Sequence, residues 1–111
     1  MMTINTVDDY ETMLCQRGRK FVYVKSDWCA DCAYADVFWP YIETLYPHTA
    51  CHVINRDTLP ELTTRLRVTG VPSYLVYEDD HEVARYVDTQ RKTFEQVKAF
   101  LDAAIAKGSD R

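Results

Sequence analysis

The chain has 111 residues, of which 47% are hydrophobic and 27% charged, and a net charge of -4; this composition is that of one soluble domain able to fold without disulfides or a metal. Its basic residues are scattered, no stretch approaches the apolar length of a membrane span, and the first residues lack the pattern of a secretion signal, which argues against nucleic acid and membranes as partners. We therefore expect a single domain over residues 1–111, monomeric and located in the cytoplasm.

The hydrophobic pattern predicts helices and strands in alternation. Helical spacing marks amphipathic helices, short runs of β-favouring residues mark strands, and the acidic pair at 79–80 marks the turn of a hairpin. In chain order we expect a helix from 7 to near 18, a strand at 21–24, a helix over 30–46, a strand at 50–54, a short helix near 60, strands at 73–77 and 83–87, and a last helix from 94 that stops before 108.

Capping residues set the expected helix ends. Thr6, Thr58 and Thr93 each precede an acidic or amide side chain three residues on, which is the pattern of a helix N-cap. Gly108 should lie just beyond the last helix, and Pro40 should kink the second one. This element order predicts an α/β fold with helices on both faces of a central mixed sheet of about four strands, with room for a short fifth strand at the N-terminus.

Cys29 and Cys32 stand where the first buried strand passes into the second helix. In a reducing compartment, a closely spaced pair among four cysteines favours redox chemistry or metal binding over a structural disulfide. At a helix N-terminus, unpaired N–H groups and the helix dipole stabilise an anion, so Cys29 is the expected nucleophile. Cys32 lies one turn further on, close enough to attack a mixed disulfide on Cys29 and release the substrate.

Zinc binding is the alternative for this pair. Together with His48 and His52, Cys29 and Cys32 formally match a zinc spacing of two cysteines and two histidines. We disfavour zinc because a full amphipathic helix separates the two pairs and His52 falls in an expected strand. The two other cysteines are interpreted as small core hydrophobes: Cys15 and Cys51.

Two motifs carry a resemblance to a known family. Residues 28–32, Trp-Cys-Ala-Asp-Cys, are similar to the Trp-Cys-x-x-Cys of the thioredoxin family, and residues 70–73, Gly-Val-Pro-Ser, resemble its Gly-Val-Pro-Thr loop. With the element order, the resemblance covers essentially the whole chain and implies a thioredoxin fold. It also implies a cis peptide bond between Val71 and Pro72 beside the sulfurs, pairing of the substrate backbone at Val71, and a substrate-binding role for Trp28.

Ala30 and Asp31, between the two cysteines, are expected to tune the redox chemistry. Asp31 makes the chain more similar to the small thioredoxin-like reductases with Trp-Cys-Pro-Asp-Cys than to standard thioredoxins. Its charge should oppose a thiolate on Cys29 and make the pair more reducing. A competing role for Asp31 is to accept the proton of Cys32 during resolution.

The chain departs from the family pattern at several positions. Tyr23 stands where the family usually buries an acid, and Val53 where it has the associated lysine, so the usual proton acceptor for the resolving thiol is missing. The helix proline is displaced to Pro40, and Val37 occupies the family's position. Asp88 replaces a frequent glycine at the rim of the active site and should restrict acidic or bulky partners.

The resemblance implies a thiol-disulfide oxidoreductase that reduces protein or small-molecule disulfides through Cys29 and Cys32. No bound cofactor is implied, because electrons come from an external donor such as a thioredoxin reductase or a low-molecular-weight thiol. The alternative is a thioredoxin-fold binding or redox-sensing module with little turnover, an interpretation that the missing acid strengthens.

Overall fold

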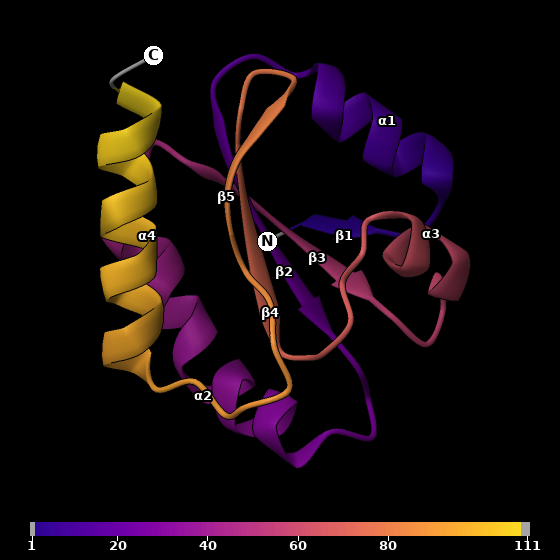
Figure 1. Ribbon diagram of the computed structural model, residues 1–111. Coiled ribbons are helices and arrows are strands. Elements are labelled where there is room, and N and C mark those ends of the chain that lie inside the picture. The colour runs from indigo at the N-terminus through magenta and orange to yellow at the C-terminus, as the bar shows by residue number, and fades with distance from the viewer. Residues whose placement is uncertain (1, 110–111) are drawn as a thin grey trace.

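The computed structural model describes residues 2–109, which form a five-stranded sheet with helices on both faces (Figure 1). The elements are β1 (Met2–Ile4), α1 (Val7–Cys15), β2 (Arg19–Lys25), α2 (Ala30–Leu45), β3 (Ala50–Asn55), α3 (Pro60–Arg65), β4 (Ser73–Glu78), β5 (His81–Tyr86) and α4 (Phe94–Ser109). The expected α/β fold is confirmed, and the short N-terminal strand is present as β1. The single domain over 1–111 stays a prediction, because residues 1 and 110–111 lie outside the described residues.

Strand pairing places β2 at the centre of the sheet. The strand order is β1-β3-β2-β4-β5, in which β2 is parallel to β3 and antiparallel to β4. Val24, near the end of β2, pairs with Ser73 at the start of β4, so the segments after β2 and before β4 meet at one end of the sheet. The β4–β5 turn, in which Asp79 has a φ of 54°, lies at the opposite end.

Side chains that alternate along the strands form two cores, one against α2 and α4 and the other against α1 and α3. On the α2 and α4 side, the ring of Tyr23 stacks on that of Tyr74 with centroids 5.3 Å apart, and the Trp39 ring of α2 lies 5.1 Å from Tyr23. Such ring pairs contribute about 0.5–1.5 kcal/mol each beyond the area they bury. The Tyr23 hydroxyl lies 3.1 Å from the carbonyl oxygen of Cys32, so this aromatic cluster reaches the first turn of α2.

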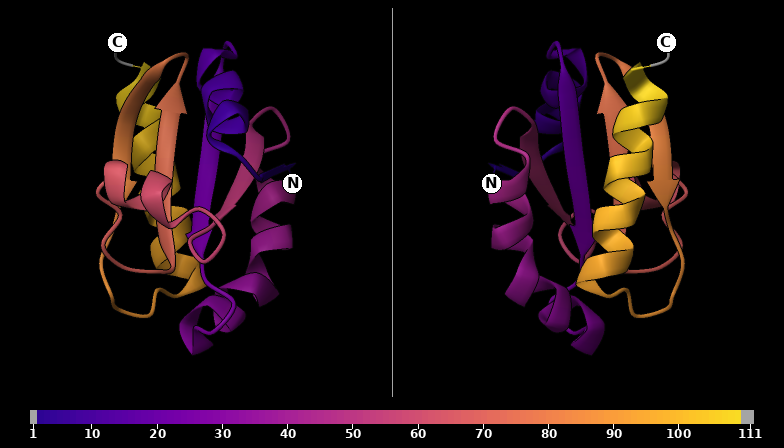
Figure 2. Two further views of the ribbon diagram at one scale, coloured as in Figure 1. Left: turned by 90° about the vertical axis from the view of Figure 1, so that its right-hand side faces the viewer. Right: turned by 90° about the vertical axis from the view of Figure 1, so that its left-hand side faces the viewer.

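Helix α2 contains Pro40 and still continues to Leu45. Proline has no N–H to donate, and its ring crowds the carbonyl four residues earlier, here that of Asp36. The helix changes direction along its length, so the expected kink is present (Figure 2). In the part of the chain that the structure describes, no helix is both long enough and apolar enough to cross a membrane.

The caps at Thr6 and Thr93 are confirmed, because each hydroxyl accepts the N–H three residues on. Three other predictions are wrong. Thr58 does not cap α3, because its hydroxyl donates to a carbonyl in the preceding turn and the helix begins at the following proline. Gly108 lies within α4, which runs one residue further, and Cys15 is exposed because it ends α1 on the solvent side.

Candidate active site

The loop between β2 and α2 carries Cys29 and is anchored before it reaches the sulfur. The Asp57 carboxylate accepts the N–H of Asp27 at 2.9 Å and the hydroxyl of Ser26 at 2.9 Å and 3.0 Å. These two hydrogen bonds, that from the backbone first, hold the pKa of Asp57 below its usual range. These contacts anchor the loop before it enters α2, and Trp28, next to Cys29, is 93% exposed.

Cys29 is the N-cap of α2, as the sequence predicts. Its half-buried Sγ accepts the N–H of Cys32 at 3.2 Å, one of the unpaired donors of the helix N-terminus. The same sulfur lies 3.8 Å from the carbonyl oxygen of Val71. The N–H group and the helix dipole both favour negative charge on this sulfur, which is the requirement for a thiolate nucleophile.

Cys32 is a different kind of thiol. It is 1% exposed, packed among the apolar side chains between the sheet and α1. Burial, and then its hydrogen bond with the Cys29 thiol, raise the pKa of Cys32 to about 12. It is therefore protonated and protected until a disulfide forms beside it on Cys29.

The segment before β4 completes this end of the sheet. The peptide bond between Val71 and Pro72 is cis, and both residues are buried beside the dithiol. The Ser73 hydroxyl donates to the Gly70 carbonyl at 2.6 Å and closes the turn. Substrate pairing at Val71 and substrate contact at Trp28 stay predictions, since the chain is described without a substrate.

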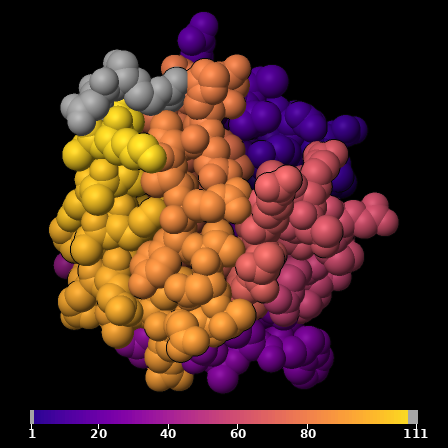
Figure 3. Space-filling view, in the orientation of Figure 1, coloured from indigo at the N-terminus to yellow at the C-terminus, as the bar shows by residue number. Residues whose placement is uncertain are grey.

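The Asp31 carboxylate has an ion-pair partner that the sequence did not indicate. This carboxylate lies 2.9 Å from Nε of Arg91, in the loop between β5 and α4. The Arg91 guanidinium also lies over the ring of Tyr34, 4.5 Å from the ring centroid. The loop reaches the lower edge of the face drawn in Figure 3, beside atoms of α2. Ala30, the other expected tuning residue, is exposed in the first turn of α2.

An Asp31→Asn variant is expected to raise the reduction potential of the dithiol by about 20 mV. Exposed charges a few ångströms apart interact by about 1 kcal/mol, and about 1.4 kcal/mol corresponds to about 30 mV for a two-electron couple. Arg91→Gln should lower the potential by a similar amount because it leaves Asp31 unopposed, and the double variant should return close to the wild-type value. Equilibration with glutathione measures all three; an Arg91→Gln variant with the wild-type potential would contradict this balance of charges.

Asp88 is engaged within its own loop. Its carboxylate accepts the Nζ of the buried Lys92 at 2.6 Å and the N–H of Gln90 at 2.9 Å. The Lys92 hydrogen bond is the main reason why the pKa of Asp88 is lowered. Its negative charge is thus paired with a cation, and the expected restriction on acidic or bulky partners stays a prediction.

Tyr23 and Lys25 of β2 contact α2 through the side chain of Asp36. The Tyr23 hydroxyl lies 3.0 Å from Oδ1 of Asp36, and Nζ of Lys25 donates to Oδ2 of Asp36 at 2.7 Å. The sequence shows that the family's usual acid is missing at Tyr23, but it does not indicate that Asp36 lies beside that residue. The sequence feature that could have located Asp36 is helical spacing, because Asp36 follows Cys32 by four residues and therefore lies on the same face of the helix.

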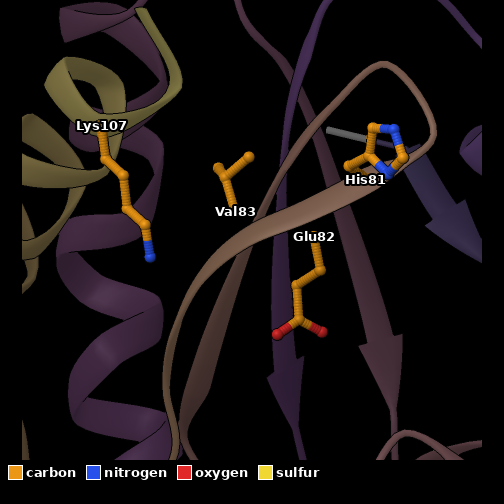
Figure 4. Close-up of a pocket in the computed structure, with 4 residues that line it drawn as sticks. All are labelled: His81, Glu82, Val83 and Lys107. Atoms are coloured by element: carbon orange, nitrogen blue, oxygen red, sulfur yellow. The ribbon is translucent and has the colours of Figure 1, made fainter. Parts of the chain in front are cut away.

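Two further features of residues 2–109 bear on this site: the zinc alternative and a hollow at the other end of the sheet. Within residues 2–109, no three His, Cys, Asp or Glu side chains converge as metal ligands, so the histidines of the zinc alternative do not join the cysteines. A hollow between β5 and α4 is lined by His81, Glu82, Val83 and Lys107 (Figure 4). It lies at the opposite end of the sheet from Cys29, and its carboxylate is bound by Arg85.

Comparison with known sequences supports the resemblance. The family model described as Thioredoxin matches residues 1–103. Thioredoxin AMT13 of Alternaria alternata is 23% identical over 112 residues, covering 99% of this chain and 95% of the relative. A thioredoxin of Chlamydia pneumoniae is 26% identical over 97 residues, covering 85% of this chain and 91% of its own.

Comparison with solved structures concerns the fold. Plasmodium falciparum thioredoxin superposes with a TM-score of 0.82 at 16% identity, covering 93% of this chain and 98% of that structure. Trypanosoma brucei brucei thioredoxin gives a TM-score of 0.84 at 12% identity, covering 96% and 91% of the two chains. The arrangement of helices and strands is thus retained although few residues are identical.

Proposed function

The chain belongs to the thioredoxin family, and from that membership we propose that it reduces protein disulfides, with Cys29 as the attacking thiol and Cys32 as the resolving thiol. Members of this family are thiol-disulfide oxidoreductases that need no bound cofactor and use external reductants. The observation that carries the proposal is the asymmetry of the two thiols: Cys29 caps a helix N-terminus and Cys32 is buried behind it.

The two thiols divide the reaction into two steps. The Cys29 thiolate attacks a substrate disulfide, which forms a mixed disulfide and releases the first substrate thiolate. The sulfur of Cys32 then attacks Sγ of Cys29, forming the Cys29–Cys32 disulfide and releasing the second substrate thiolate. The dithiol loses two electrons and the substrate disulfide gains them, so an external reductant must restore the dithiol.

The surroundings of Cys29 support a protein as the substrate. The Trp28 side chain is almost fully exposed beside the sulfur, and the Val71 carbonyl lies 3.8 Å from it, within reach of an extended substrate backbone. We further propose a thioredoxin reductase or a low-molecular-weight thiol as donor, a monomeric state and a cytoplasmic location. The free thiol of the exposed Cys15 supports a reducing compartment.

Reduction of insulin disulfides in the presence of dithiothreitol tests the function. The wild-type protein should accelerate insulin precipitation at substoichiometric amounts, and Cys29→Ser should reduce the rate to that of dithiothreitol alone. Cys15→Ser removes an exposed thiol outside the site and should retain the wild-type rate. A wild-type protein that closes its disulfide once and reduces only a stoichiometric amount of insulin would instead be the sensing module of the alternative hypothesis.

A further inference from the structure

Asp36 is held in place by two residues of β2. The Tyr23 hydroxyl lies 3.0 Å from one carboxylate oxygen, and the Lys25 ammonium donates to the other at 2.7 Å. Tyr23 is also 3.1 Å from the carbonyl oxygen of Cys32, so one hydroxyl connects the first turn of α2 with the carboxylate one turn later. The Asp36 side chain is 42% exposed, which leaves a path for a proton between the site and solvent.

Resolution of a mixed disulfide needs a base near Cys32. Burial is the main cause that raises the pKa of this thiol, so only a small fraction of the molecules carries the reactive thiolate at neutral pH. A general base that removes the proton as the sulfur attacks makes the step independent of this small thiolate fraction. Such bases accelerate proton-transfer steps by about 10²–10⁴-fold.

The groups that face Cys32 differ in their ability to take up its proton. Burial raises the pKa of both Tyr23 and Tyr74 far above neutrality, so these phenols are already protonated. Asp31, in the first turn of the helix, forms an ion pair with Arg91. Asp36 remains as a carboxylate on the helix face of Cys32, and its charge contributes to the raised pKa of that thiol.

We propose that Asp36, oriented by Tyr23 and Lys25, accepts the proton of Cys32 when the mixed disulfide is resolved, directly or through one water. The proton leaves the Cys32 sulfur for the carboxylate, that sulfur forms a bond with Sγ of Cys29, and the bond between Cys29 and the substrate breaks. The substrate departs as a thiolate with the electron pair, and the proton then passes from Asp36 to solvent. The inference rests on the proposed function, whose second step it concerns.

The repulsion between two negative charges favours the transfer of the proton from Cys32 to Asp36. An ionised Asp36 opposes a thiolate on Cys32, because the two negative charges repel each other in a partly buried environment. Moving the proton from the thiol to the carboxylate neutralises Asp36 at the moment when the sulfur becomes negative, so the repulsion disappears. A carboxylate that stayed ionised would only hinder resolution.

Reaction with Ellman's reagent separates the two steps in one stopped-flow experiment. The first release of thionitrobenzoate reports attack by Cys29, and the second reports resolution by Cys32. The experiment uses the full chain with Cys15→Ser, because an exposed thiol would add its own signal. Asp36→Asn should slow the second release about 10- to 100-fold and leave the first within about twofold. Asp36→Glu should restore much of the second rate.

The pH dependence distinguishes a proton acceptor from a residue with a structural role. Between about pH 6 and about 8, the second rate should be nearly constant in the wild type, whose base is the carboxylate. In Asp36→Asn it should rise about tenfold per pH unit, because the thiolate fraction then limits the rate. Urea unfolding checks that this variant remains folded.

Three outcomes would overturn the proposal: an unchanged second rate in Asp36→Asn, a slowed rate with the flat pH profile retained, or a second rate that falls in Asp31→Asn instead. Failure of the proposed function is measured separately, because a protein without catalytic turnover fails the insulin assay whatever its two release rates are.

Discussion

A Cys32→Ser variant is expected to stop at the mixed disulfide and to lose turnover at least about 100-fold. Its Cys29 still caps α2 and still attacks, but no buried thiol stands behind it to release the substrate. Incubation with an oxidised protein substrate should therefore give an adduct of both chains, detected by intact-mass analysis and removed by dithiothreitol.

The matched control for this trap is Cys51→Ser, which replaces another buried cysteine, in β3 and outside the site. It should turn over like the wild type wherever it remains folded, and it should accumulate no adduct. An adduct that forms equally in Cys29→Ser would show that another thiol is the nucleophile. In cell extract, the Cys32→Ser variant should capture proteins that the dithiol normally reduces.

Gly70→Ala is expected to lower the free energy of unfolding by about 3 kcal/mol, because a methyl group there overpacks a rigid contact. An ideal Cβ at Gly70 would lie 2.3 Å from the carbonyl oxygen of Asp88 and 2.9 Å from the backbone nitrogen of Thr89. Both obstacles are backbone atoms, so one of the two segments must move. Since Val71 follows directly and its carbonyl faces Cys29, turnover should fall as well.

Urea denaturation measures this loss, and Gly18→Ala is its control. Gly18 has a φ of 96° with open space around its Cα, so an alanine there incurs only the dihedral strain, about 1 kcal/mol. It also lies at the opposite end of β2 from the dithiol and should leave turnover unchanged. Equal destabilisation in the two variants would show that the close approach at Gly70 is unimportant.

The sequence predicted what depends on local patterns. The alternation of apolar residues located every helix and nearly every strand, and the position of Cys29 after a strand identified the helix N-terminus that the structure shows. Short-range rules failed where a competing contact decides the outcome. Thr58 matches a capping pattern, yet Pro60 begins the helix and the Thr58 hydroxyl bonds elsewhere.

The rest of the site depends on contacts between segments far apart in the chain. Arg91 reaches Asp31 only because the loop after β5 folds back over α2, and no spacing rule connects residues so distant. The sequence shows that the family's acid is missing at Tyr23, whereas the contact of Tyr23 with Asp36 depends on how β2 packs against α2. Helical periodicity could locate Asp36, which follows Cys32 by four residues, but it could not predict the contacts of Asp36 with β2.

The opposed ends of the sheet make the molecule easy to mount in a defined orientation. The dithiol lies where β2 ends, while the last turn of α4 lies beside Glu78 at the β4–β5 turn (Figure 1). A tether at the exposed Lys107 would therefore hold the protein to a bead or an electrode with Trp28 and Cys29 facing the solution. In this orientation, the current measured at the electrode, or the amount of thiol captured on the bead, reports the redox state of the solution that faces the dithiol.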